Sequence, residues 1–167
     1  DKRTRRHAKR ARAADLTPEE EVLQDARRGL DLLRREKRIN GRHLFALGHS
    51  LGGTLLPRLA QQDSALAGLI LLAGAARPLE DLIVEQVAYI ASLDGQVDPN
   101  ESRRLTRLQN QAAQVQDPSL STATPASALP LGLGPHYWLY LRAYDPVLSA
   151  AALAQPMLFL QGGRDYQ

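Results

Sequence analysis

The chain has 167 residues, of which 44% are hydrophobic and 23% charged, with a net charge of +3 and no cysteine. These values are typical of one globular domain, and no apolar stretch reaches the ~18 residues that a membrane-spanning helix needs. The absence of cysteine excludes disulfides, zinc–thiolate sites and thiol nucleophiles, so nucleophilic chemistry falls to Ser, Thr, Asp, Glu or Lys. We therefore expect a soluble domain without a membrane partner.

Basic residues crowd the first twelve positions, between Lys2 and Arg12. Such an arm could bind phosphates, but no aromatic residues are interleaved with it to stack on bases. We favour a solvated surface loop and expect no nucleic-acid partner. The chain begins at Asp1, its one methionine is Met157, and it stops at Gln167 just after a Gly-Gly turn. We therefore expect a fragment, and its compartment stays open.

The first part of the chain alternates helical patterns with short apolar runs. Thr17 and Pro18 supply an N-cap and a proline at the first helical position. The expected elements, in chain order, are a helix over 17–36, a strand over 43–47 buried on both faces, a helix over 51–61 that Pro57 kinks, and a strand over 67–74. This order predicts a parallel sheet with crossover helices.

From Arg77 to about Leu141 the pattern changes to helices and loose linkers. The expected elements are a helix from Leu79 to near Gly95, a helix over 101–116, and a proline-rich irregular loop over 117–135. A short helix over 147–154 and a strand over 157–160 then restore the sheet. We expect residues 1–77 and 143–167 to form a partial α/β core and residues 78–142 to form a helical cap or lid.

One short motif carries chemistry. Residues 48–52, Gly-His-Ser-Leu-Gly, match G-x-S-x-G at the point where an apolar strand turns sharply into a helix. A serine on this strained turn needs flanking residues without side chains, and Gly48, Gly52 and Gly53 provide that room. The motif predicts Ser50 as a nucleophile and the backbone N–H of Leu51, at a helix N-terminus, as an oxyanion donor. The alternative is a glycine-rich turn with an N-capping serine.

A nucleophilic serine needs a histidine to take its proton and a carboxylate to orient that histidine. Asp165 follows the last strand and is the candidate acid, with an ordinary turn aspartate as the alternative. The acid normally precedes the base, yet no histidine follows Asp165. The four histidines present, His7, His43, His49 and His136, fit the role poorly, so we expect the base to lie beyond Gln167.

Three blocks of sequence are specific when taken together: residues 45–58 (FALGHSLGGTLLPR), 69–81 (LILLAGAARPLED) and 157–167 (MLFLQGGRDYQ). With them the chain resembles bacterial capped α/β-hydrolase carboxylesterases related to the serine aminopeptidase group. The resemblance implies an α/β-hydrolase fold with a helical cap insertion, incomplete at both ends. It also implies Ser50 as nucleophile, Leu51 as an oxyanion donor and Asp165 as triad acid, with the first strands, the second oxyanion donor and the histidine missing.

We therefore expect an esterase in which Ser50 attacks a small-molecule carboxylic ester, with no metal and no organic cofactor. A peptidase or acyltransferase with the same triad, or a non-catalytic hydrolase-like protein, are the alternatives. The candidate substrate contacts are His49, Tyr137, Trp138 and Tyr140, although packing in the core or cap is the commoner role of such aromatics. Lacking a base, this chain is expected to be inactive alone, and the sequence leaves its oligomeric state open.

Overall fold

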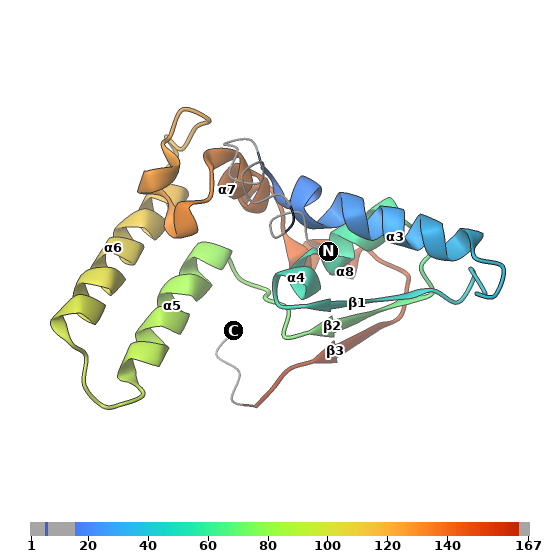
Figure 1. Cartoon of the computed structure of the whole chain (residues 1–167), viewed down its shortest axis with the longest axis horizontal. Helices are drawn as coiled ribbons and strands as arrows, with labels where there is room; N and C mark the ends of the chain where they lie inside the picture. Colours follow the sequence, from blue (N-terminus) through green and yellow to red (C-terminus); the bar gives the residue numbers. More distant parts are fainter. Residues whose placement is uncertain (1–5, 7–15, 164–167) are drawn as a thin grey trace.

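The structure, a computed structural model, describes Arg6 and residues 16–163 of the chain. A parallel sheet with helices against one side lies next to a separate group of helices (Figure 1). The basic arm, apart from Arg6, falls outside the described residues. No helix in the described part is both long and apolar enough to cross a membrane.

Within the described residues, three short parallel strands form the sheet in the order β1-β2-β3. Its elements are η1 (Glu19–Leu23), α3 (Gln24–Arg35), β1 (Phe45–His49), α4 (Leu51–Gln62), β2 (Gly68–Leu72), α8 (Pro146–Ala151) and β3 (Met157–Leu160). The strands pair in register, with Leu47 opposite Ile70 and Ile70 opposite Leu158. Parallel strands place their carboxyl ends at one edge, which is where ligands bind in open α/β sheets.

The second group of helices lies between β2 and β3 in the sequence. It comprises α5 (Leu79–Ser92), α6 (Pro99–Gln116), the short turns η2 (Ala126–Ala128) and η3 (Pro130–Gly132), and α7 (Pro135–Arg142). Helix α6 begins two residues before the expected Glu101, because Asp98 caps it. The Asp98 carboxylate accepts the backbone N–H groups of Asn100 and Glu101, and the Glu101 side chain accepts the Asp98 N–H in return.

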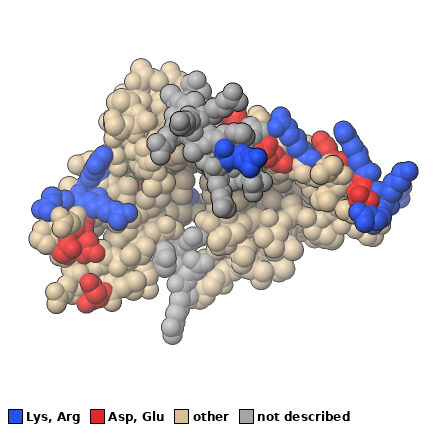
Figure 2. Space-filling model, in the orientation of Figure 1, with Lys and Arg blue, Asp and Glu red and all other residues tan. Residues whose placement is uncertain are grey.

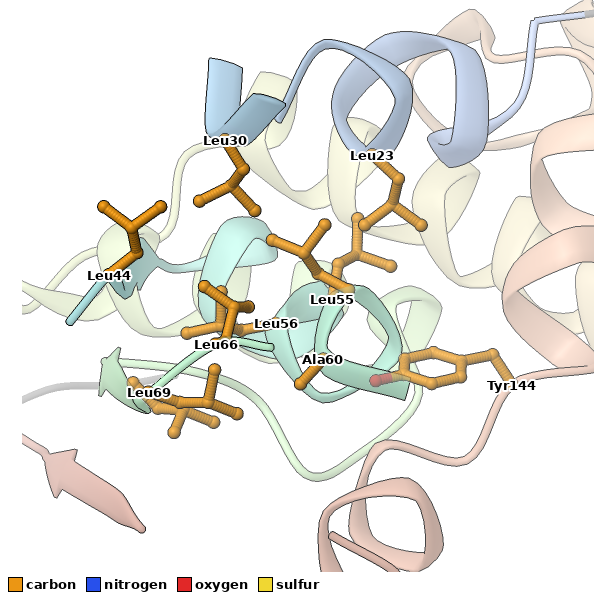
Figure 3. Packing of buried hydrophobic residues seen from close by; sticks show 11 residues of the cluster. Leu23, Leu30, Leu44, Leu55, Leu56, Ala60, Leu66, Leu69 and Tyr144 are labelled. Atoms are coloured by element: carbon orange, nitrogen blue, oxygen red, sulfur yellow. The ribbon is translucent and has the colours of Figure 1, made fainter. Parts of the chain in front are cut away.

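Each group has its own buried hydrophobic cluster. Leucines of η1, α3, α4 and β2 and of the segments just before β1 and β2, joined by Ala60 and Tyr144, form the cluster between the sheet and its helices (Figure 3). The second cluster gathers residues from α5, α6 and α7 and the loop between α6 and α7: Ile83, Leu108, Val115, Leu120, Leu129 and Trp138. Because the second cluster draws nothing from the sheet, residues 79–141 pack largely among themselves.

The strand beginning near residue 43 differs from expectation in bounds and burial. It spans Phe45–His49, and its side chains on one face are exposed, with Phe45 at 60% and Leu47 at 62%. Leu158 and Leu160 of β3 are exposed on the same face. The expected burial on both faces is therefore wrong for the described part of the chain, since its helices pack against only the other face.

Helix α4 runs through Pro57, which is buried within it. A proline in a helix interior removes the hydrogen bond to the carbonyl four residues earlier. Here the helix continues for five residues beyond it, to Gln62. Packing of Leu55, Leu56 and Leu59 in the cluster between the sheet and its helices stabilises the helix on both sides of the proline.

Candidate active site

Ser50 forms the tip of the turn between β1 and α4 and has a positive φ of 53° with ψ −122°, a region that residues with a side chain rarely occupy. A residue with a side chain reaches this region only under constraint. Two hydrogen bonds supply that constraint: the Ser50 N–H donates to the Leu72 carbonyl, and the Thr54 N–H donates to the Ser50 carbonyl, each at 3.0 Å. The turn is thereby tied to both β2 and α4.

Glycines allow the strand and helix to approach this closely. A Cβ atom at Gly48 would lie 2.2 Å from the Gly52 carbonyl oxygen, and one at Gly53 would lie 2.9 Å from the Gly74 Cα. These neighbours are backbone atoms that cannot move aside. At Gly52, in contrast, a Cβ would meet nothing within 4 Å. The expected steric need therefore holds for Gly48 and Gly53 but is wrong for Gly52, and Gly74 is an additional close approach.

The first backbone N–H groups of α4 can stabilise a negative charge. Leu51, Gly52 and Gly53 occupy its first three positions, whose N–H groups have no acceptor within the helix. The Ser50 side chain makes no capping hydrogen bond to them, so the capping alternative does not describe this turn. The helix dipole adds to the positive potential at the same place.

Thr54 and Tyr144 hold the turn in place through hydrogen bonds. The Thr54 hydroxyl donates to the Ser50 carbonyl at 3.3 Å and accepts the Ala75 N–H at 2.9 Å. The Tyr144 hydroxyl donates to the Thr54 carbonyl at 2.7 Å, and burial raises the pKa of Tyr144 to about 12, which keeps that donor protonated. Sequence reasoning missed both residues, since neither stands in a recognised motif.

A cavity of about 460 Å³ opens beside Ser50. Helix α4 contributes Leu51 and Thr54 to its wall, the segment after β2 contributes residues 75–80, and the segment around α8 contributes residues 141–147. Its volume falls in the range of small-molecule sites. Ser50 therefore lies in a cavity formed jointly by the sheet end and the inserted helices.

Among the described residues, Glu80 is the one charged residue that is buried, with 5% of its surface exposed. It lines this cavity. Burial raises its pKa, the nearby Asp81 raises it further, and the field of Arg142 lowers it. A signal for it was present in the sequence, because Glu80 precedes Ile83 and Val87 at helical spacing and so shares their apolar face. That acid among apolar positions could have identified it.

The four candidate substrate contacts do not line the cavity. His49 is exposed at the end of β1. Trp138 is fully buried in the cluster of α5, α6 and α7, and Tyr137 is buried with its hydroxyl donating to Glu21 at 2.7 Å. The centre of the Tyr140 ring lies 4.7 Å from Arg58 Cζ, and the Tyr140 hydroxyl donates to Glu19. The structure therefore places the three aromatics in packing and tethering contacts, the alternative that the sequence left open.

The candidate triad partners are only partly described. Asp165 lies outside the described residues, as does His7. His43, His49 and His136 are described, and none of them lines the cavity. Within the described part of the chain there is also no group of three metal-ligating side chains.

The fold and turn are those of an α/β-hydrolase, and a comparison with family models agrees. The model described as serine aminopeptidase, S33, matches residues 7–166, and the chain belongs to this family. Among curated proteins, the chain is similar to esterase EstD of Thermotoga maritima, with 34% identity over 153 residues. That match covers 91% of this chain and 34% of the relative, so the chain spans about a third of the relative's length. No solved structure matches.

Proposed function

We propose that the protein is a serine carboxylesterase that works through an acyl-enzyme intermediate. One observation carries the proposal: Ser50 has strained backbone angles at the tip of a strand-to-helix turn and opens onto a cavity of about 460 Å³. The similarity to a protein named as an esterase supports the reaction class. Residues 78–142 would form the cap, since α5 supplies one wall of the cavity.

In this mechanism Ser50 Oγ attacks the ester carbonyl carbon while a base takes its proton. Negative charge moves to the carbonyl oxygen, where the Leu51 N–H would stabilise it. The alcohol then leaves with the proton, and water hydrolyses the acyl-enzyme to return Ser50. Asp165 would orient the base. We propose that a histidine from outside the chain's 167 residues is that base, and that the chain is inactive without it.

A fluorophosphonate probe tests the nucleophile, because it reacts with an activated serine hydroxyl. In the complete protein that contains this chain, we expect Ser50→Ala to abolish labelling and to lower hydrolysis of an aryl ester by at least about a thousandfold. Ser64→Ala, in the exposed turn after α4, is the matched control and should label as the wild type does.

Three outcomes would count against the proposal. Equal labelling of wild type and Ser50→Ala would overturn the nucleophile. An unlabelled wild type would favour a non-catalytic protein. Faster cleavage of a matched anilide than of the ester would favour a peptidase.

A further inference from the structure

Glu80 is an unusual group in the cavity beside Ser50. It lies in the first turn of α5, yet only 5% of its surface is exposed. A buried carboxylate loses hydration that it can recover only through a cation or hydrogen-bond donors. The helix dipole favours an acid in this turn but does not require its burial, and Asp81 beside it fulfils the same role without lining the cavity.

The other charged groups around the cavity are already engaged. Arg77 forms two hydrogen bonds with Glu85, at 2.7 and 2.6 Å. Arg142 Nη1 donates to the carbonyls of Val115 and Asp117, at 2.9 and 3.0 Å. Asp145 caps α8 by accepting the Leu148 N–H at 2.8 Å. Their charges or hydrogen-bonding groups are therefore committed within the protein.

Glu80 has no such partner within the described part of the chain. Its hydrogen bond there is to its own backbone N–H, and Arg142 reaches it through its field. The rest of the wall near it is largely apolar, with Leu79, Leu82 and Leu141. A largely apolar wall with one buried carboxylate that has no ion pair and no side-chain hydrogen bond within the described residues is complementary to an apolar ligand that carries one positive charge.

We propose that Glu80 binds a positively charged group of the substrate, so that the cavity selects esters whose acyl or alcohol part carries an ammonium. This proposal rests on the proposed esterase function. Ser50 and Glu80 line the same cavity, so one molecule can contact both. The ammonium would replace the water that the carboxylate loses on burial, and Glu80 would act as a specificity-determining residue that takes no part in proton transfer.

Two isosteric pairs of esters test this directly. The butyrate esters of choline (butyrylcholine) and of 3,3-dimethylbutanol differ by a positive nitrogen in place of a carbon on the alcohol side. The nitrophenyl esters of β-alanine and butyric acid differ by an ammonium in place of a methyl on the acyl side. In the complete protein, we expect kcat/KM to favour the charged member of at least one pair by about 10- to 100-fold, through a charge-assisted hydrogen bond for the β-alanine ester and through Coulomb attraction for the choline ester, whose nitrogen has no N–H.

Glu80→Gln keeps the shape and removes the charge, and it should bring that ratio close to one. Asp81→Asn is the matched control, because it removes a neighbouring carboxylate that does not line the cavity, and it should keep the ratio. Equal kcat/KM for both members of both pairs in the wild type would overturn the subsite. So would an unchanged preference in Glu80→Gln.

A binding measurement separates failure of the subsite from failure of the proposed function. Choline is titrated calorimetrically into Ser50→Ala and into Ser50→Ala with Glu80→Gln, neither of which needs to turn over. Binding that requires Glu80, with no ester hydrolysed by the wild type, would keep the subsite and overturn the esterase. Hydrolysis without charge preference, and without choline binding, would do the reverse.

Discussion

At Ser50, a residue with a side chain adopts a φ of 53°, an arrangement that costs about 1–3 kcal/mol. The hydrogen bonds to Leu72 and from Thr54 hold it there, and Gly48 makes room for the turn. The same backbone path that strains the serine brings the first amides of α4 together on one side of it. Strain and the candidate oxyanion site therefore have one cause.

Two glycines of the motif differ in what they permit, and this yields a prediction. Gly48→Ala would drive a Cβ into the Gly52 carbonyl, so we expect it to lower the free energy of unfolding by about 1–3 kcal/mol or more. Gly52→Ala meets nothing and adds helix propensity, so we expect no loss and a gain of up to about 1 kcal/mol. Urea unfolding of both variants measures the difference, and equal losses would contradict the geometry.

At this scale the sequence predicted the turn but little of the wall around it. The motif located Ser50 and Leu51, because G-x-S-x-G is a local pattern with a local steric reason. Tyr144, between α7 and α8, reaches the turn through tertiary packing that no short pattern encodes, whereas Glu80 stood as an acid on an otherwise apolar helical face. The sequence suggested Tyr137, Trp138 and Tyr140 as substrate contacts only because they are aromatic. Burial and a hydrogen bond to Glu21 determine where Tyr137 lies.

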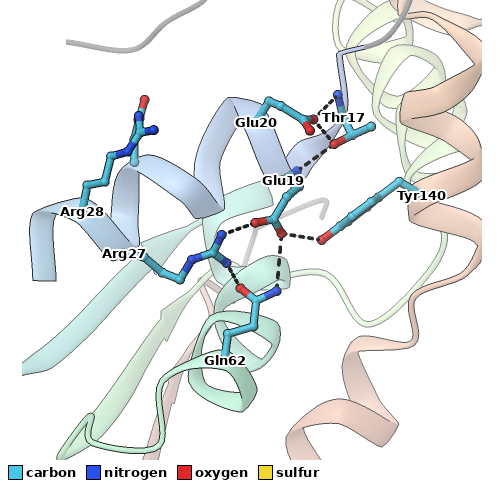
Figure 4. A network of polar contacts seen from close by, with 8 residues as sticks. Thr17, Glu19, Glu20, Arg27, Arg28, Gln62 and Tyr140 are labelled. Atoms are coloured by element: carbon cyan, nitrogen blue, oxygen red, sulfur yellow. Dashed lines mark hydrogen bonds and ion pairs between the residues drawn. The ribbon is translucent and has the colours of Figure 1, made fainter. Parts of the chain in front are cut away.

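Helix α7 is tethered to the start of the chain rather than only to its own group. Figure 4 shows Glu19 of η1 between Arg27 of α3, Gln62 of α4 and Tyr140 of α7. Tyr137 donates to Glu21 in the same region. The two tyrosine contacts join residues 116 and 121 positions apart in sequence. Helix α7 therefore connects the inserted helices to the helices that pack on the sheet.

The two tyrosines of this tether should differ in strength. Tyr137→Phe removes a buried hydrogen bond of 2.7 Å to a carboxylate and should cost about 1.5–3 kcal/mol in the free energy of unfolding. Tyr140→Phe removes a contact of 3.3 Å and retains the ring beside Arg58, so it should cost about 1 kcal/mol or less. Denaturant unfolding of the two variants gives the comparison. A larger loss of unfolding free energy for Tyr140→Phe would mean that the contact with Glu19, and not the one with Glu21, is the stronger part of the tether.

Element order was predictable from the sequence, and element bounds were less so. Periodicity and turn signals indicated the strands and most helices in their observed order, but α7 (Pro135–Arg142) was not predicted. The first strand lies two residues later than its apolar run, because pairing with β2 begins at Phe45. Its exposed face could not be predicted from the run itself, since an apolar pattern does not show whether a second layer is present.

At the scale of the whole molecule, the basic and the exposed large apolar side chains of the described residues gather in different places. Basic side chains gather at the two ends of the face in Figure 2, over α6 and over α3. The uncovered sheet face carries large apolar side chains, among them Phe45, Leu47 and Leu158. The inserted helices and the sheet have separate buried clusters and meet around the cavity. Charges at that junction are consequently expected to affect stability.

Two carboxylates near this junction should therefore shift stability with pH in opposite directions. Burial raises the pKa of Glu80 above its ordinary value of 4.5, so folding favours its protonated form and loses stability as pH rises through that window. Desolvation raises the pKa of Glu19, but hydrogen bonds from Arg27, Gln62 and Tyr140 together with the charge of Arg27 lower it below 4.5. Its contribution is therefore present above 4.5 and is lost as pH falls through its folded pKa.

The variants follow from these signs. Near pH 7, Glu80→Gln should unfold at a higher urea concentration than the wild type, and Glu19→Gln at a lower one. Both differences should shrink as the pH is lowered, the first on approaching 4.5 and the second below it. Urea midpoints taken along a pH series measure them. A Glu80→Gln variant less stable than the wild type at neutral pH would mean that Glu80 stabilises the fold. The gain expected instead fits a residue retained for binding at a cost in stability.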